Sequence, residues 1–356
     1  MATSKSSSLD RLITRHSLEV PNLLKARQNT RRKLTELEEA IRESRIISPN
    51  TEDESLVVYG SLARQEVTDS SDADWTLLVD SRVNLQLELK AQQCEELFRN
   101  AGLRDPGATR TFGTHSVSHD LVYKIGGGGD TNENTTKRIL LLLESVAVGP
   151  ASVHNRVVRS VLEKYLAPEN TYHQGEGAKY RVPRILLNDV FRYWRTMTVD
   201  FAAKNWQNDG QKWGLRNSKL RFSRKLIFMA GYLACLRVEL RQDNESDQSN
   251  LDAREFLENV LVRQTPVEIV AETCLLYNVP SDIVRGVFNN YDHFIQVLSD
   301  SSARDSLKKL AIADAKQDNV YQSEISGYST AFHDALESLL FDHEPIKKLN
   351  RKYGVL

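Results

Sequence analysis

Two apolar segments, joined through a glycine–serine turn and with a pair of aspartates at the start of the second, constrain the fold of this chain most strongly. The first, a short run with strand composition, stops at Gly60, where the missing side chain lets backbone N–H groups approach an anion closely. Ser61 adds a hydroxyl to this turn. The second run, residues 72–79, also has strand composition, and strand alternation sends Asp72 and Asp74 to the same face. We therefore expect two strands of one sheet that carry an anion-binding turn and two aligned carboxylates.

Aligned carboxylates of this kind are ligands for divalent cations. Mg²⁺ prefers carboxylates, waters and substrate phosphates to an all-protein cage, so two or three aspartates are enough for a site. Two such ions roughly 3.5–4 Å apart stabilise the charge of an in-line attack on a phosphoryl group. A third carboxylate is expected on a neighbouring strand, and the candidate is Asp120, in the apolar run 117–123 before the glycine stretch 126–129. The sequence thus predicts two Mg²⁺ ions, replaceable by Mn²⁺, bound by Asp72, Asp74 and Asp120.

Each of these residues also has a purely structural interpretation. A Gly-Ser dipeptide is common, and acids spaced by one residue occur on solvated strands. Their combination at this spacing favours metal binding for Asp72 and Asp74, because exposed paired acids are otherwise unfavourable within a strand. Asp120 can instead form a hydrogen-bonded structural pair with His119. We interpret His115 and His119 as packing or loop residues and do not assign them catalysis.

The composition is that of a globular chain with little net charge. The 356 residues include 47 Lys and Arg against 48 Asp and Glu, so we expect no broad basic face for a nucleic acid, and any polyanion must bind locally. The three cysteines are far apart, which argues against a disulfide framework or a zinc site and fits a reducing cytosol. No apolar run has the length of a membrane span, and the first residues are polar. We therefore expect a cytoplasmic protein without membrane insertion.

Three successive parts are predicted along the chain. Residues 1–48 form a polar tail and a helical arm, and residues 49–167 form a mixed α/β core around the two predicted strands. Residues 168–356 are helical in pattern throughout and form an all-α lobe. The predicted fold class is α+β, with the active cleft between core and lobe, because pockets favour such interfaces.

Local signals also predict several helix ends. Pro21 is placed where a second helix of the arm begins, and Gly102 is placed to end a helix of the core. A further helix is expected to follow the glycine stretch and to run to about Val148. Its N-cap is one of three polar residues, Thr131, Asn132 or Asn134.

A basic cluster lies in the helical lobe, where Arg216 is followed within ten residues by Lys219, Arg221, Arg224 and Lys225. On a helix, residues four apart share a face, so part of the cluster can point into one cleft. Guanidinium groups are well suited to the β- and γ-phosphates of a triphosphate. The alternative is a solvated face, or one paired with carboxylates, because charge runs usually are solvated.

The Gly-Ser turn followed by an Asp-x-Asp strand resembles the polymerase-β-like nucleotidyltransferase superfamily. Four further strings, which together with the motif span roughly residues 50–235, look like a poorly characterised bacterial group related to the nucleotidyltransferase domain of PII uridylyltransferase. They are residues 118–122, 138–145, 188–196 and 215–225. The resemblance implies a mixed-sheet nucleotidyltransferase core, with Gly60 and Ser61 for the triphosphate, Asp72 and Asp74 for metal, and Asp120 as third acid. Ala73 departs from the usual larger aliphatic residue, which concerns packing more than catalysis.

Three functional hypotheses follow from this resemblance. The first is an ATP-binding or other nucleoside-triphosphate-binding transferase that joins nucleotides into a signal or short oligonucleotide in anti-phage defence, with an effector protein encoded nearby. The second is a transferase that nucleotidylates a protein hydroxyl, as antitoxins of this superfamily do. The third is a nucleotide-binding regulatory subunit without turnover, which the intact motif residues argue against. PII modification is not expected, because the chain is too short for the hydrolase and regulatory domains of the uridylyltransferase.

Overall fold

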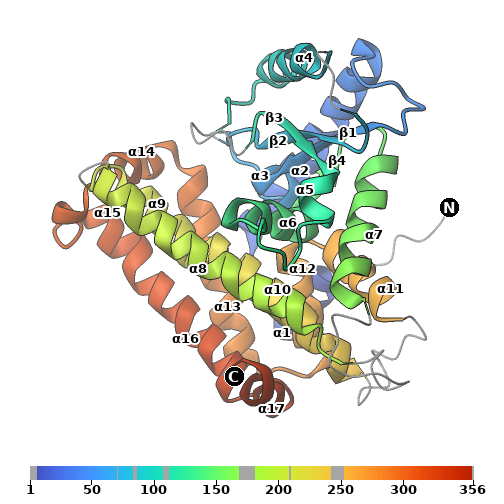
Figure 1. Ribbon diagram of the computed structural model, residues 1–356. Helices are drawn as coiled ribbons and strands as arrows, with labels where there is room; N and C mark the ends of the chain where they lie inside the picture. Colours follow the sequence, from blue (N-terminus) through green and yellow to red (C-terminus); the bar gives the residue numbers. More distant parts are fainter. Residues whose placement is uncertain are drawn as a thin grey trace. The chain divides into compact units, whose positions relative to one another are not determined.

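The computed structural model describes residues 6–69, 71–82, 86–106, 112–167, 181–207, 210–241 and 252–354. Its contacts divide the chain into two compact units, each of which is built from segments that are distant in sequence (Figure 1). We call them the sheet unit (Lys25–Ala178 and Asp252–Thr265) and the helical unit (Met1–Leu24, Lys179–Leu251 and Pro266–Leu356). The predicted α+β class is confirmed.

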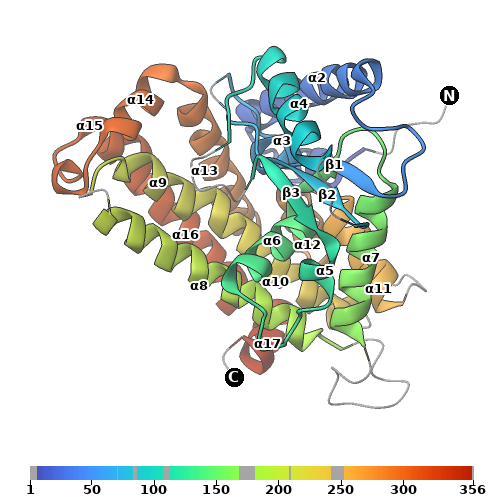
Figure 2. The same ribbon diagram turned by 45° about the horizontal axis from the view of Figure 1, so that its top comes forward.

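The sheet unit contains a mixed four-stranded sheet with the order β3-β2-β1-β4. Figure 2 labels β1, β2 and β3 of this sheet. β1 pairs antiparallel with both β2 and β4, whereas β2 and β3 are parallel. The strands are β1 (Glu54–Tyr59), β2 (Trp75–Val79), β3 (Thr114–Val117) and β4 (Ser145–Ala147). The two apolar runs expected to be strands of one sheet are therefore hydrogen-bonded neighbours.

Helices cover both faces of this sheet. Alternate residues of β1 and β2, such as Leu56, Trp75 and Leu77, are fully buried in a core shared with α2 and α4. The residues between them face the side on which α7 packs against β1 and β2. The helices of the unit are α2 (Pro21–Ser44, mostly in this unit), α3 (Gly60–Arg64), α4 (Gln86–Asn100), α5 (Ser118–Val122), α6 (Asn132–Leu143), α7 (Ser152–Leu166), α11 (Ala253–Leu257) and the π-helix η5 (Glu258–Val262).

Two sequence predictions about secondary structure are wrong. The helix expected to reach about Val148 ends at Leu143, and the next residues form β4, whose backbone pairs with β1. Asp120 was expected on a strand, but it lies on α5, a short helix that begins directly after β3. At both places, from α6 to β4 and from β3 to α5, the chain passes from one element to the next without a glycine or proline. No local sequence signal therefore marks the boundary.

The helical unit is an all-α assembly around α10, of which nearly every residue is buried. α8, α12 and α17 pack against α10, and α13 packs along α16. In its interior Phe222 stacks on Phe294 and also contacts the tilted ring of Phe332. The helices are α1 (Ser8–His16), α8 (Arg184–Gln207), α9 (Trp213–Lys219), the π-helix η3 (Leu220–Arg224), α10 (Lys225–Leu240), α12 (Pro266–Leu276), α13 (Ser281–Ser299), α14 (Ser301–Lys309), the 3₁₀ helix η6 (Ile312–Asp314), α15 (Asn319–Tyr321), the π-helix η7 (Gln322–Ser326), α16 (Gly327–Phe341) and α17 (Glu344–Tyr353).

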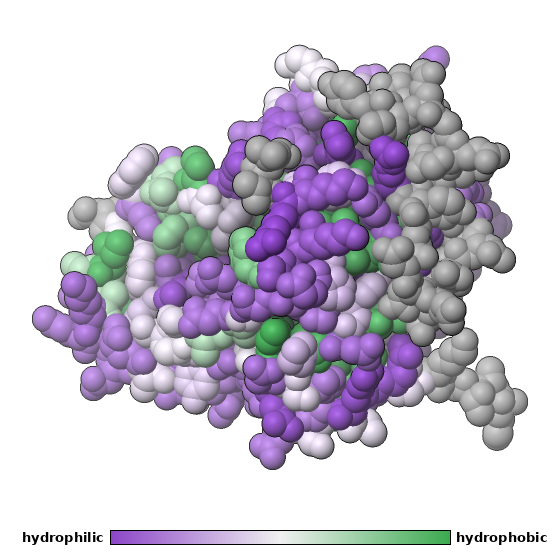
Figure 3. All heavy atoms as spheres, turned by 90° about the horizontal axis from the view of Figure 1, so that it is seen from below, coloured by the Kyte–Doolittle hydropathy of each residue, from purple (hydrophilic) through white to green (hydrophobic). Residues whose placement is uncertain are grey.

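No helix in the described ranges is long and apolar enough to cross a membrane. The face drawn in Figure 3 is mostly hydrophilic, with apolar side chains in small separate patches.

Candidate active site

Gly60 follows β1 as the first residue of α3 and lies directly against the carboxylate of Asp74. Its φ of +65° is in the left-handed region, which favours glycine. A Cβ at this position would lie 2.9 Å from Oδ2 of Asp74, closer than real side chains approach. The backbone joins the same two segments, because the N–H of Tyr59 donates to the carbonyl oxygen of Asp74 over 2.7 Å. The structure therefore brings the predicted anion-binding turn and one predicted metal ligand into contact.

Asp72 and Asp74 lie in an extended segment just before β2, which begins at Trp75 and not at residue 72 as expected. Asp72 forms an isolated bridge with Arg104, and the N–H of Ala73 donates to the carbonyl oxygen of Arg104 over 2.8 Å. Ala73 is fully buried in the core beneath α2 and α4, whereas both aspartates are only partly buried. This alternation matches the expectation that the two carboxylates leave the same side of the segment.

Ser61 is on the first turn of α3, which closes tightly upon itself. Its carbonyl oxygen accepts the N–H of Glu66 over 2.8 Å, and Gln65 has a φ of +61° that turns the chain back. Ser61 is partly exposed and follows Gly60 directly. The turn thus presents backbone and hydroxyl donors from a fixed loop.

Arg64 holds this turn to the sheet through two buried carboxylates that the sequence reasoning did not identify. Its Nε donates to Glu66 over 2.8 Å, and its Nη1 donates to Glu144, the residue before β4. The two glutamate side chains are only 3% and 7% exposed, so Arg64 supplies buried counter-charge. Tyr59, whose β4 partner follows Glu144, has its pKa raised by burial and, less strongly, by the Glu144 charge. The pairing with Glu144 had no local signal, because that residue was expected inside a helix.

Asp120 does not join the other two aspartates. β2 and β3 are parallel with Val79 opposite Val117, so α5 starts beside Asp80, whose carboxylate accepts the Ser118 hydroxyl. The five residues of β2 separate that end from Asp74 by about 17 Å, at roughly 3.3 Å per residue. Asp120 instead pairs with Lys124 over 2.7 Å, and the hydrogen bond from this lysine lowers its pKa. Asp120 was expected to be a third ligand beside Asp72 and Asp74. This expectation is corrected here, because the direction of the strands places Asp120 at the other end of β2.

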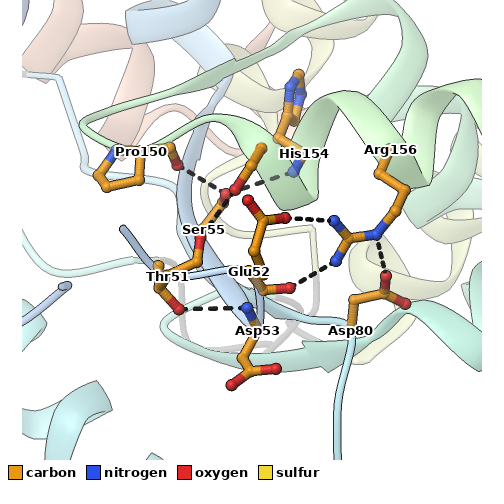
Figure 4. A network of polar contacts seen from close by, with 9 residues as sticks. Thr51, Glu52, Asp53, Ser55, Asp80, Pro150, His154 and Arg156 are labelled. Carbon is orange, nitrogen blue, oxygen red and sulfur yellow. Dashed lines mark hydrogen bonds and ion pairs between the residues drawn. The ribbon is translucent and has the colours of Figure 1, made fainter. Parts of the chain in front are cut away.

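Two neighbouring sets of polar contacts join α7 to the ends of β1 and β2 (Figure 4). In the first, the guanidinium of Arg156 donates to the carboxylate of Asp80 over 2.7 Å, and to the side chain and backbone of Glu52. In the second, the hydroxyl of Ser55 donates to the carbonyl oxygen of Pro150 and accepts the N–H of His154. Both sets fix α7 in place, and they lie at the end of β2 opposite Asp74.

His154 and Ser145 form a buried pair that is not a nucleophile–base pair. The serine hydroxyl lies 2.8 Å from Nε2 of His154, and it donates its one proton to the carbonyl oxygen of Leu141 over 2.6 Å. The imidazole must then donate from Nε2, so it cannot accept the hydroxyl proton. Burial lowers the pKa of His154 to about 4, which keeps the ring neutral.

The basic cluster lies at the junction of α9, η3 and α10 in the helical unit. Within the described part of the chain, Arg221, Arg224 and Lys225 form no ion pair with a carboxylate. Arg221 donates only to Thr330 Oγ1, at 3.5 Å. Burial and the nearby Arg221 charge lower the pKa of Lys225 to about 8, against a smaller opposing effect of Asp334. The interpretation of these three residues as a face that is neutralised by carboxylates is therefore wrong.

Arg216 differs from the rest of the cluster because it has a structural role. Its guanidinium donates to the carbonyl oxygens of Lys204, Gln211 and Lys212 and to the side chain of Asn205. It thereby joins the end of α8 to the start of α9.

The donor set fits a Mg²⁺ site that the substrate completes. Among the residues that the structure describes, no group of three or more His, Cys, Asp or Glu side chains is placed to hold a metal ion. Asp72 and Asp74 would be two carboxylate ligands, with phosphate oxygens and water as the others, which is the usual Mg²⁺ environment. A scan against models of known protein families finds no match for this chain, and a search of curated proteins finds none either.

Proposed function

We propose that the Gly60 turn and the aspartate pair form the active site of a Mg²⁺-dependent nucleotidyltransferase with a polymerase-β-like core. The close approach of Gly60 to the Asp74 carboxylate carries this inference. An anion that binds the N–H groups of the turn is held next to a carboxylate, which is unfavourable unless a cation lies between the two. A phosphate chain with bound Mg²⁺ meets that condition.

In the proposed reaction, a hydroxyl oxygen of the acceptor attacks the α-phosphorus of a nucleoside triphosphate. The bond from this phosphorus to the bridging oxygen breaks, pyrophosphate leaves, and the hydroxyl proton passes to solvent. When bound, Mg²⁺ would supply positive charge for the phosphoryl oxygens and for the leaving group. Gly60 and Ser61 orient the triphosphate, and Asp72 and Asp74 fix the position of the metal. Arg64 keeps the turn in place through its ion pairs with Glu66 and Glu144.

Separately, we propose that the basic cluster of the helical unit, namely Lys219, Arg221, Arg224 and Lys225, binds the phosphates of a nucleoside triphosphate. Support comes from the lack of carboxylate partners for the last three within the described ranges, and from the lowered pKa of Lys225. Like charges packed together are relieved by an anion, and charged hydrogen bonds to phosphate are short and strong. The acceptor that we propose is a nucleotide or short oligonucleotide, and the product a signal for an effector in anti-phage defence.

Incorporation of labelled nucleotide tests this function. Wild-type protein is incubated with each labelled triphosphate and Mg²⁺, and labelled small product is separated from labelled protein. Asp74→Asn and Asp72→Asn are expected to reduce transfer by more than about a hundredfold, because each removes a metal ligand from a site with few. Asp69→Asn, an exposed acid of the same loop, is the control and keeps full activity. Wild-type protein that labels nothing, or ligand variants that match the control, would show that the assignment is wrong; label on the protein itself would identify a protein hydroxyl as acceptor.

A further inference from the structure

One face of α8 is polar in its first half and apolar in its second. The outward-facing residues of the first half, Arg184 and Asn188, are exposed, as expected of a solvated helix. On the same face further along, Val199 is 67% exposed and Trp206 is 84% exposed. Single exposed apolar residues are common on protein surfaces. Tryptophan and arginine, however, are enriched at protein–protein interfaces, and here both lie on the same exposed side of one helix.

This face is exposed although the helix itself is firmly held. Its buried side includes Leu186 and Tyr193, and on the flank of the helix Trp194 stacks on Phe228 with ring centroids 5.6 Å apart, while Phe191 contacts the same ring. At its C-terminal end, Arg216 donates to the carbonyl oxygen of Lys204 and to the Asn205 side chain. The exposure of Trp206 is therefore not that of a frayed helix end.

Four residues define the stripe, which we call the α8 stripe: Arg195, Val199, Ala202 and Trp206. At 100° per residue, their spacings of four, three and four place them within an arc of about 60°. The stripe runs about 16 Å along the helix, at 1.5 Å per residue. Because Ala202 is small, a second helix can approach the middle of the stripe closely.

The order of spacings is the same in both directions, so the stripe is complementary to itself. When two copies pack antiparallel about a two-fold axis between Val199 and Ala202, each Val199 meets Ala202 of the other copy. Each Arg195 then meets Trp206 of the other copy. A guanidinium over an indole face is the most favourable cation–π pair, and it is stronger when desolvated. Parallel packing would instead place two arginines together at one end.

We propose that the α8 stripe is the docking surface for a second copy of this chain, in an antiparallel two-fold dimer. Two-fold dimers use the same patch on both subunits, which is the requirement that the stripe meets. One helix pair buries less than a standard interface of about 1,600 Å², so the dimer is a weak and reversible one. This inference is independent of the proposed nucleotidyl transfer.

Analytical ultracentrifugation over a concentration series measures the association. Wild-type protein is expected to shift from monomer to dimer, and Trp206→Glu is expected to raise the dissociation constant at least about thirtyfold, because both Arg195–Trp206 pairs of the dimer are lost. The matched control is Leu89→Asp, since Leu89 is 57% exposed on α4 of the other unit. A wild-type chain that stays monomeric throughout the series, or a control that dissociates as readily as Trp206→Glu, would overturn the dimer.

Disulfide trapping tests the antiparallel register. The three native cysteines are buried, so they give no background. A mixture of the single variants Arg195→Cys and Trp206→Cys is expected to form a disulfide-linked heterodimer on mild oxidation, and this heterodimer keeps the second Arg195–Trp206 pair. Neither variant alone is expected to cross-link. Efficient cross-linking of either variant by itself would indicate parallel packing and reject the proposed register.

Discussion

At the scale of single residues, Gly60 combines a positive φ with a close contact to a proposed metal ligand. Gly60→Ala adds a Cβ 2.9 Å from the Asp74 carboxylate in addition to the backbone strain of a positive φ. Such strain alone costs about 1–2 kcal/mol. We expect transfer activity to fall much further than stability, because the added atom displaces a proposed metal ligand. Parallel measurements of nucleotide incorporation and thermal unfolding check this.

Gly102→Ala is a close control for that change. Gly102 also has a positive φ, of +75°, but an added Cβ would meet no atom within 4 Å. It should show the backbone cost without the loss of activity. If both variants lose the same fraction of activity, strain in the fold explains the effect, and displacement of Asp74 does not.

His154 gives the sheet unit a dependence of stability on pH. Its pKa falls from 6.5 to about 4 because the ring is buried. The unfolded chain therefore binds a proton at a higher pH than the folded chain, and stability that is complete above pH 6.5 is lost as the pH falls toward 4. The loss amounts to roughly 3 kcal/mol at 1.36 kcal/mol per pKa unit.

Chemical denaturation across this pH range measures the effect, with His154→Gln as the test variant. The glutamine has no titrating group, so the variant should be less stable near neutral pH but should lose less stability on acidification. The exposed His333, replaced by glutamine, is the control and should keep the wild-type slope. A His154→Gln variant with an unchanged slope would assign the acid sensitivity to other groups.

At the scale of secondary-structure elements, the attachment of α3 to β4 depends on Arg64. Arg64→Gln removes the guanidinium that pairs with the buried Glu66 and Glu144 carboxylates, and breaking a buried pair in this way costs about 3–5 kcal/mol. The triple variant, with all three residues replaced by glutamine, also removes the two carboxylate charges and is expected to recover most of that stability. Denaturant titrations of the single and triple variants measure the difference. A triple variant as unstable as Arg64→Gln would mean that the ion pairs are not what holds the turn.

Helix ends were predictable where a local residue determines them. α2 begins at Pro21, the Thr131 side chain accepts the N–H of Asn134 at the start of α6, and Gly102 takes a positive φ just after α4. These signals act over a few residues, so the sequence contains them in full. The places of β4 and of Asp120 were not predictable, because they depend on which strands pair and in which direction.

At the scale of the whole molecule, the division into units was only partly readable from the sequence. Residues 252–265 belong to the sheet unit although they follow a long helical segment of the other unit. There, α11 packs on α7, and Arg159 forms an ion pair with Glu258 of η5 at 3.6 Å. The polar run 241–250 comes directly before this return, but such a run indicates a loop between helices and does not show that the chain enters the other unit. The predicted parts 1–48, 49–167 and 168–356 follow the order of the chain, whereas the units join segments from distant positions.

The whole chain has a net charge of −1, so attraction for a triphosphate must come from a local group of cations. Lys225 makes this testable, because its pKa of about 8 in the free protein lies well below its ordinary value of 10.5. A bound polyphosphate favours the charged form and raises this pKa, so binding takes up a proton above about pH 8. Affinity for a non-hydrolysable triphosphate is therefore expected to be highest below pH 8 and to fall as the pH rises.

Calorimetric titrations between about pH 7 and about pH 10, in buffers of different ionisation enthalpy, measure both the affinity and the proton uptake. Lys225→Met is expected to weaken triphosphate binding by about 1.5–3 kcal/mol below pH 8, the scale of a charged hydrogen bond, and to abolish the proton uptake. Binding of the matching monophosphate should change little, because it lacks the phosphates that the cluster is proposed to hold. Lys348→Met, an exposed lysine of α17, is the control and should behave as wild type. If Lys225→Met keeps the wild-type affinity and proton uptake, the triphosphate tail binds elsewhere.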